Sequence, residues 1–181
     1  GEDFFLYRPN HLLTSTRYQD LAKVTNTVHA ALDSGDYLGA IWLESSTSVE
    51  ETTFWLSLLI DTTVPIVGNA AQRTNRQLSA DGPQNIADSV AYIVSRKWAD
   101  ADGKNGMGVV VIEDEQIFAA RQIQKSDARP GGFVATGDHG GVLGTMGEPG
   151  SLQIYFKPHT RNTWNSEVRL STLPELVKGV V

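Results

Sequence analysis

A five-residue stretch with four hydroxyl groups and one carboxylate is the part of this sequence best suited to chemistry. It consists of Glu44, Ser45, Ser46, Thr47 and Ser48. Hydroxyl groups donate and accept hydrogen bonds, and a neighbouring base can convert one of them into a nucleophile. The stretch also fits an ordinary helix N-terminus, with Ser48 as the cap and Glu50 and Glu51 in the first turn. One hydroxyl is enough for a cap, so the rest of the cluster would still need a role.

The segments on either side place this cluster between a strand and a helix. Residues 37–43 form an apolar run typical of a strand, and residues 49–60 have the spacing of an amphipathic helix. Further helices are predicted over 17–35 and 84–99, and further strands over 63–68 and 107–113. Alternating strands and helices predict an α/β fold with a mostly parallel, doubly wound sheet and flanking helices. Ligands of such folds bind at the carboxyl ends of strands, where the cluster lies.

The chain after Ile117 differs in composition from the part before it. Residues 126–150 are rich in Gly, Pro and Asp and are expected to be loops. Residues 151–158 and 167–173 alternate well enough for two short strands. Residues 177–181 resemble the opening of another apolar strand. The alternation of strands and helices is therefore confined to the part of the chain before Ile117.

Composition excludes several classes of function. The chain has 181 residues, no cysteine, a formal net charge of −6 and a pI near 5.1. Scattered basic residues argue against nucleic acid as a partner, since phosphate binding needs clustered Lys and Arg. The lack of cysteine excludes disulfides, a thiol nucleophile and thiolate metal ligands, and leaves both cytoplasm and periplasm open as compartments. No apolar run approaches the ~20 residues of a membrane span.

No metal or cofactor is expected. The four histidines never reach a spacing typical of zinc ligands. The glycine pairs at 131–132 and 140–141 lack the strand-to-helix context of a dinucleotide-binding turn, so a flexible loop is the better interpretation.

Four segments carry a resemblance to a known family. They are 21-LAKVTN-26, V-E-E-T at Val49 to Thr52, 65-PIVGNA-70 with 79-SADGPQN-85, and 109-VVVIEDEQIFAARQIQKSDA-128. In this order and spacing they resemble the bacterial L-asparaginase/glutaminase amidohydrolases, over about residues 10–181. The resemblance implies the N-terminal α/β domain of that family. Within S-A-D-G-P, Asp81 is expected to cap the helix that opens at Pro83.

The resemblance also implies a reaction centre. Family members use a threonine in an N-terminal T-G-G-T-I strand as nucleophile, together with a second Thr-Asp-Lys group. The second threonine falls on Ser46, the aspartate on Thr47 and the lysine on Lys125. A lysine beside a hydroxyl can activate it or relay a proton. The hydroxyl and the lysine are therefore kept, and the aspartate is lost.

Four further positions correspond to substrate recognition in the family. The Ser-Gln pair that grips the substrate carboxylate falls on Asn10 and His11, and the His-Gly pair of the central motif falls on Glu44 and Ser45. Asn10 and His11 can both donate hydrogen bonds, although Pro9-Asn10 is also a common turn pair.

The lost aspartate bears on the substrate. Neutral Thr47 cannot pair with an α-ammonium group, and an ammonium left unpaired in a desolvated pocket costs ~2–4 kcal/mol. Glu44 could restore the charge from a different place, or it could point away and act in the first turn of the neighbouring helix.

The resemblance therefore implies a hydrolase that uses a hydroxyl nucleophile on an amide or related acyl substrate other than plain L-asparagine. An altered amide, a lactam, a lactone or an ester without a free α-amino group fits the neutral position. The alternative is a non-catalytic protein that binds a small molecule on the same scaffold. Homo-oligomers are expected, because family members complete their sites across subunit contacts.

The resemblance also divides the chain. Residues 1–176 correspond to the N-terminal domain without its first strand, and residues 177–181 to the start of a linker or strand into a missing C-terminal domain. The strand with the nucleophilic threonine would lie before Gly1. A fragment, a second polypeptide or an interrupted structure would each account for this arrangement.

Overall fold

The computed structural model describes residues 3–8, 18–136, 141–148, 151–159 and 164. Within these residues the chain forms three helices, a six-stranded sheet and a two-stranded ribbon. The helices are α1 (Tyr18–Asp33), α2 (Val49–Leu59) and α3 (Gly82–Ser95). The strands of the sheet are β1 (Ala40–Leu43), β2 (Ile66–Asn69), β3 (Val110–Glu113), β4 (Gln116–Ala119), β7 (Val142–Thr145) and β8 (Gln153–Ile154), and the ribbon consists of β5 (Ile123–Lys125) and β6 (Phe133–Ala135).

The sheet has a parallel half and an antiparallel half. Its order is β1-β2-β3-β4-β7-β8, with β1, β2 and β3 parallel and each later neighbour antiparallel. The reversal occurs at Asp114 and Glu115, whose φ angles of 48° and 61° suit the tight two-residue hairpin turns in which both central residues have positive φ. The predicted α/β fold is confirmed, and its sheet is mixed because this short turn replaces a helical crossover.

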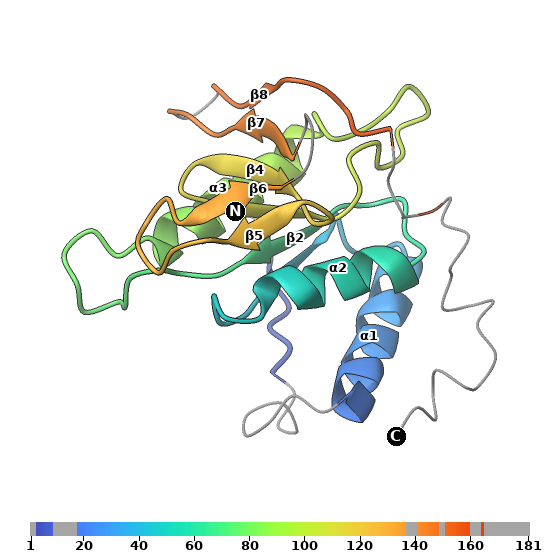
Figure 1. Ribbon diagram of the computed structural model, residues 1–181. Helices are drawn as coiled ribbons and strands as arrows, with labels where there is room; N and C mark the ends of the chain where they lie inside the picture. The colour runs from blue at the N-terminus through green and yellow to red at the C-terminus, as the bar shows by residue number, and fades with distance from the viewer. Residues whose placement is uncertain (1–2, 9–17, 137–140, 149–150, 160–163, 165–181) are drawn as a thin grey trace.

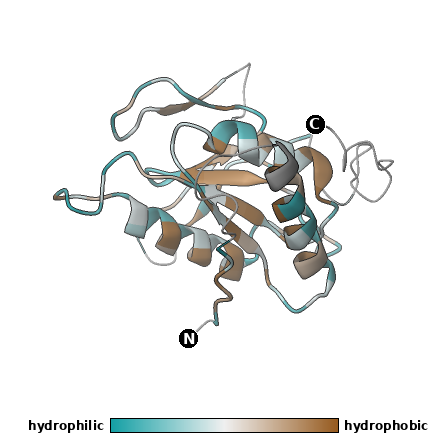
Figure 2. Ribbon diagram, turned by 90° about the horizontal axis from the view of Figure 1, so that it is seen from below, coloured by the Kyte–Doolittle hydropathy of each residue, from teal (hydrophilic) through white to brown (hydrophobic). Residues whose placement is uncertain are grey.

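Helices cover both faces of the parallel half, which confirms the doubly wound arrangement. Side chains of β3 alternate between the two layers: Val110 and Ile112 pack with Tyr92 of α3, whereas Val111 packs with Val49 of α2. Figure 1 shows α1 and α2 on one side of the strands and α3 on the other. The apolar strands lie between these helices in Figure 2. This double burial explains the continuous apolar character of β3.

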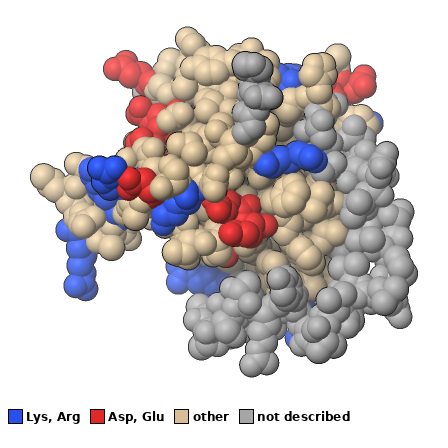
Figure 3. All heavy atoms as spheres, viewed as in Figure 1, with Lys and Arg blue, Asp and Glu red and all other residues tan. Residues whose placement is uncertain are grey.

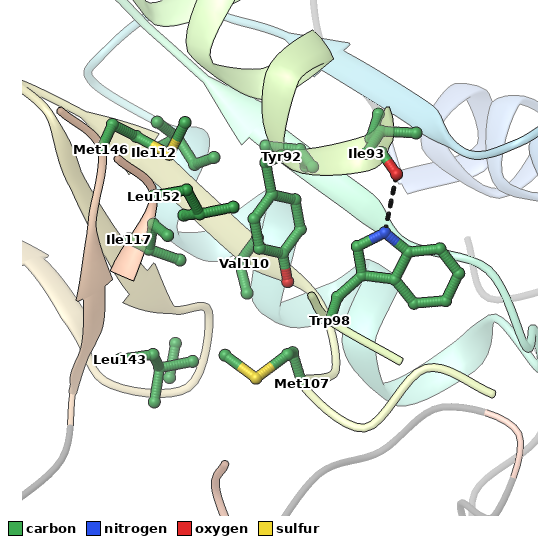
Figure 4. Close-up of a cluster of buried hydrophobic side chains, with 12 residues drawn as sticks. Tyr92, Ile93, Trp98, Met107, Val110, Ile112, Ile117, Leu143, Met146 and Leu152 are labelled. Carbon is green, nitrogen blue, oxygen red and sulfur yellow. Dashed lines mark hydrogen bonds between the residues drawn. The ribbon is translucent and has the colours of Figure 1, made fainter. Parts of the chain in front are cut away.

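Among the described residues, the buried apolar cluster with the most members lies beneath α3, and it is drawn in Figure 4. Tyr92 lies among Val110, Ile117 and Leu143, so residues from the parallel and antiparallel halves share one cluster. On the opposite face, a Cβ added to Gly68 of β2 would lie 2.4 Å from the Thr53 side chain. Glycine at that position lets α2 pack closely on the strand that neighbours β1.

The predicted helices differ from the observed ones at their ends. α3 ends at Ser95 rather than at residue 99, because Arg96 takes the left-handed conformation with a φ of 54°. The indole Nε1 of Trp98 then donates to the carbonyl of Ile93 at 2.8 Å, which satisfies one of the last carbonyls of the helix.

Four expectations for the chain after Ile117 either need correction or concern residues that the structure does not describe. The interval 126–150 was expected to be loop, yet it contains β6 and β7. The strand expected over 151–158 is reduced to the two residues of β8. The segments 167–173 and 177–181 lie outside the described residues.

Neither expected helix cap forms. Asp81 precedes α3, but it has helical dihedral angles, and its carboxylate accepts the backbone N–H groups of Gln72 and Arg73 at 2.7 and 2.9 Å. A cap residue normally has extended dihedral angles that turn its side chain toward the first helical N–H groups. Ser48 precedes α2 without capping it, because its hydroxyl donates to Glu44 instead.

No helix within the described part of the chain is both long and apolar enough to cross a membrane.

Candidate active site

The hydroxyl cluster occupies the turn between β1 and α2, at the carboxyl end of a parallel strand. Lys125, the last residue of β5, reaches this turn from 79 positions further along the chain and donates from Nζ to the Ser46 hydroxyl at 2.7 Å. Both residues are half-buried. The structure thus brings together two of the three residues predicted to be catalytic.

Glu50 fixes the strand that delivers the lysine. Its carboxylate accepts the backbone N–H of Lys125 at 2.5 Å, which ties the end of β5 to the first turn of α2. On the other side of β5, Lys125 pairs with Phe133 of β6. Both the strand end and the helix start are therefore held, and the lysine side chain points across the gap between them.

The immediate surroundings of the lysine contain a hydroxyl but no paired carboxylate. Among the described residues, one ion pair with a nitrogen-to-oxygen distance of 4.0 Å or less is formed, between Arg129 and Asp127. Within that part of the chain, the Lys125 ammonium therefore has no acidic partner in contact. On the face seen in Figure 3, basic side chains are interspersed with acidic ones.

Thr47 and Ser45 flank Ser46 with neutral groups. Their hydroxyl oxygens lie 3.0 Å apart, and both residues are exposed. Thr47 occupies the position at which the family resemblance places an aspartate. The exposed side of the turn therefore offers hydrogen bonds without charge.

Glu44 is engaged within the turn itself. One carboxylate oxygen accepts the indole N–H of Trp42 and the other accepts the Ser48 hydroxyl, both at 2.8 Å. Of the two roles left open for Glu44, this geometry matches the one at the start of the neighbouring helix. Its predicted contact with substrate stays a prediction, as does that of Ser45.

Asn10 and His11, the other two predicted substrate-binding residues, lie outside the described residues.

An open hollow of about 260 Å³ lies beside this turn. Its lining includes Glu50 and Gln124, which are the residue that holds β5 and the residue before Lys125. Phe54 and Arg121 face each other across part of it, with the guanidinium carbon 6.0 Å from the ring centroid. The hollow therefore has both apolar and charged walls.

A buried polar network at the ends of β2 and β3 was missed by the sequence analysis. Glu113 is 1% exposed and accepts N–H groups from Ala70 and, at 2.9 Å, from the Asn85 side chain. Asn69 donates to the Ile112 carbonyl at 2.8 Å and accepts the Ser89 hydroxyl at 3.0 Å. An acidic residue at the end of an apolar strand was the available signal, but such a residue usually faces water.

Burial is the main influence on the pKa values of the acidic residues in and near this network. The pKa of Glu113 is raised from 4.5 to about 7, chiefly by burial and also by nearby Asp81 and Asp114, while the N–H donors of Ala70 and Asn85 oppose the shift. Burial also raises the pKa of Asp88, which lies in α3 together with Asn85.

Within the described residues, no group of three or more His, Asp or Glu side chains could hold a metal ion.

Comparison with known proteins places this geometry in a family context. Residues 10–158, more than half of the chain, match the family model described as asparaginase, N-terminal. The chain is 32% identical to a glutaminase-asparaginase of Acinetobacter glutaminasificans over 148 residues, which are 80% of this chain and 42% of that protein. It is 28% identical to L-asparaginase 2 of Bacillus subtilis (strain 168) over 161 residues, covering 86% of this chain and 40% of that protein.

Solved structures give the same fold. The structure of a probable cytoplasmic L-asparaginase from Campylobacter jejuni matches with a TM-score of 0.73 at 24% identity, covering 87% of this chain and 48% of that one. The chain spans about two fifths of the length of the curated relatives described above.

Proposed function

From the premise that this chain belongs to the asparaginase family, we propose that it forms the reaction centre of a hydrolase acting on an amide or a related acyl substrate. The contact that carries this proposal is the 2.7 Å hydrogen bond between Lys125 and Ser46 at the carboxyl end of β1. A lysine amine in contact with a hydroxyl can take or relay its proton, which is the step that hydroxyl-based acyl transfer needs. Thr47 lines the same centre from the next position.

The substrate of this hydrolase lacks a free α-ammonium group in our proposal. The exposed side of the turn carries the Ser45 and Thr47 hydroxyls, and both carboxylate oxygens of Glu44 are already bonded inside it. An α-ammonium bound here without a carboxylate would lose ~2–4 kcal/mol of binding. An altered amide, a lactam, a lactone or an ester meets neutral hydrogen-bonding groups and avoids this loss.

We propose that further parts of the active site lie outside the described residues. The curated relatives are more than twice as long as the matched region, so the chain accounts for only part of such a protein. A homo-oligomer, or a second polypeptide that carries the C-terminal domain, would complete the site.

Turnover assays on the purified protein test the substrate class. Ammonia release from asparagine and glutamine is expected to be weak beside hydrolysis of esters or lactones that have no α-amino group. Robust turnover of asparagine would overturn the altered-substrate proposal while leaving the hydrolase class intact.

A lysine substitution separates an enzyme from a binding protein. Lys125→Ala is expected to lower turnover by about 10²–10⁴-fold, whereas a non-catalytic binder would keep most of its affinity for a small molecule. Lys97→Ala is the matched control, because that exposed lysine donates to the Leu152 carbonyl at 2.5 Å, away from the turn.

A further inference from the structure

One peptide group connects the buried network with the turn of residues 44–48. The N–H of Ala70 donates to the Glu113 carboxylate, and the carbonyl of the same peptide group, from Asn69, accepts the backbone N–H of Glu44 at 3.1 Å. We propose that Glu113 is a positioning residue for this turn, and that its ionisation state sets how firmly the Asn69–Ala70 peptide holds the N–H of Glu44. The inference rests on the proposed function, because the turn carries Ser46, and it goes beyond that function by giving a buried residue a part in the reaction.

The peptide group can transmit the charge of Glu113. A hydrogen bond to an ionised carboxylate is about twice as strong as one between neutral groups. It polarises the peptide, so that the carbonyl at the other end becomes a better acceptor, and a low-dielectric interior strengthens this effect. Glu113 is 1% exposed, and its charge is therefore poorly screened by water. We expect the bond from Glu44 to be stronger when Glu113 is ionised and weaker when it is protonated.

The Glu44 bond lies where the chain leaves the sheet. Leu43, the last residue of β1, is paired with Asn69, and Glu44 extends that pairing by one residue. Ser46 follows two residues later and accepts the hydrogen bond from Lys125. A change in how firmly Glu44 is held therefore changes the position of the Ser46 hydroxyl relative to the amine.

The carboxylate of Glu113 is held in a way that depends on its charge. One oxygen accepts the Ala70 N–H, and the other accepts the Asn85 side-chain N–H at 2.9 Å. Asn85 is fixed in turn, since it also donates to the Ala70 carbonyl and accepts the backbone N–H of Asp114, both at 3.2 Å. Two N–H donors suit an ionised carboxylate, whereas a protonated carboxyl group brings an O–H donor that needs an acceptor. Protonation is therefore expected to loosen the contacts with Ala70 and Asn85.

The charged groups around Glu113 place its titration near neutral pH. Asp81 and Asp114 face it, and together with burial they raise its pKa to about 7. Of the other elements packed nearby, α3 carries Asp88, whose pKa is also raised by burial, and the loop after β2 carries Arg73, whose guanidinium donates to a carbonyl of its own loop. The residues of the ribbon and its loop that line the hollow beside Glu113 are uncharged. The turn is therefore expected to tighten as the pH rises through about 7.

Amide NMR of the 181-residue chain tests this link without a substrate. The amide signal of Ala70 reports the charge of its acceptor, and the amide signal of Glu44 reports the transmitted effect. Both are expected to shift across neutral pH with one common midpoint. In Glu113→Gln the side-chain oxygen can still accept the Ala70 N–H but has no proton to lose, so both shifts should disappear. Asp88→Asn is the matched control, because it removes the other buried acid of this region and should leave both shifts in place.

The pH profile of kcat tests the consequence for the reaction. With p-nitrophenyl acetate, an ester without an α-amino group, kcat of the parent is expected to rise by about twofold to tenfold across the titration of Glu113, up to the contribution of one ordinary hydrogen bond. Glu113→Gln should lose this step at an unchanged KM, and Asp88→Asn should keep it. A merely structural role for Glu113 would lower activity at every pH and would not remove one step of the profile.

Three results would overturn the inference. The first is an Ala70 signal that titrates across neutral pH while the Glu44 signal does not, a result that needs no variant to fold. The second is a pair of shifts that persists in Glu113→Gln, and the third is a kcat step that persists in this variant. An ester hydrolase without a common midpoint for the two amides would contradict the inference and leave the proposed function standing. A common midpoint in a protein that hydrolyses no acyl substrate would contradict the proposed function and leave the peptide link standing.

Discussion

The turn after β1 and the ends of β2 and β3 lie at the same edge of the parallel sheet, and both are rich in polar side chains. At the turn, Ser45 and Thr47 are exposed and Lys125 contacts a hydroxyl. At the ends of β2 and β3, Asn69 and Glu113 are each 1% exposed and hold buried hydrogen bonds to backbone and side chains. The polar side chains at the carboxyl ends of these strands therefore differ in their exposure to solvent. We infer that the open turn does the chemistry and that the buried network fixes the strands around it.

Substitution of the lysine should have the largest effect and should separate the two regions. Lys125→Ala is expected to lower kcat by about 10²–10⁴-fold, the range of a lost general base, with little change in stability. Steady-state kinetics together with thermal denaturation give both quantities. A large loss of stability with unchanged kcat would instead assign the open turn a structural role like that of the buried network.

Removal of the buried carboxylate should give the opposite pattern. Glu113→Ala leaves the N–H groups of Ala70 and Asn85 without their acceptor, and is expected to lower the free energy of unfolding by about 2–5 kcal/mol. Urea denaturation measures the loss. Glu51→Ala is the matched control, since that exposed residue should change stability by less than about 0.5 kcal/mol. Equal effects from the two variants would contradict the structural role of the network.

The stability of the fold should also depend on pH through Glu113. Its pKa rises from 4.5 in the unfolded chain to about 7 in the fold, so the folded state holds the proton between these values. The contribution is full below pH 4.5 and is lost as the pH rises through about 7, an effect on the order of 3 kcal/mol. Unfolding measured from pH 4.5 to 8 should show this decline in the parent and a flatter profile in Glu113→Gln. Identical profiles would remove Glu113 as the cause, leaving other buried acids such as Asp88.

The sequence predicts the parallel half of the fold better than the antiparallel half, for a physical reason. The helices and β1 to β3 follow from local periodicity and from residues such as Pro83, which opens the predicted third helix. β7 consists of Val142–Thr145 in a glycine-rich segment, and it becomes a strand only by pairing with β4 and β8. A Cβ on Gly144 would lie 2.2 Å from the Gln153 carbonyl oxygen, so a residue typical of loops is required here by the close approach of a strand.

The same distinction applies to the site. The contact of Ser46 with Lys125 was predicted from the family resemblance, because 79 residues of separation give no periodic signal. The burial of Glu113 could not be predicted, since it depends on the backbone of Ala70 and on the side chain of Asn85, which come from other elements. The sequence therefore indicates which groups could carry chemistry, and the packing of distant segments decides which of them are exposed to water.

The smallest effect should come from the hydrogen bond between Ser48 and Glu44, and it sharpens what the open turn contributes. Ser48→Ala removes a donor from a half-buried carboxylate, which is expected to lower stability by about 0.5–1.5 kcal/mol. If Ser48 acted as a cap, it would stabilise α2 whether or not Glu44 is present. If it acts as a donor to Glu44, its contribution requires Glu44. In a double-mutant cycle with Glu44→Ala, the loss on Ser48→Ala should therefore largely disappear. If urea denaturation instead showed that the two losses add, Ser48 would act as a cap of α2. Glu44 would then be free to act elsewhere, including on the substrate.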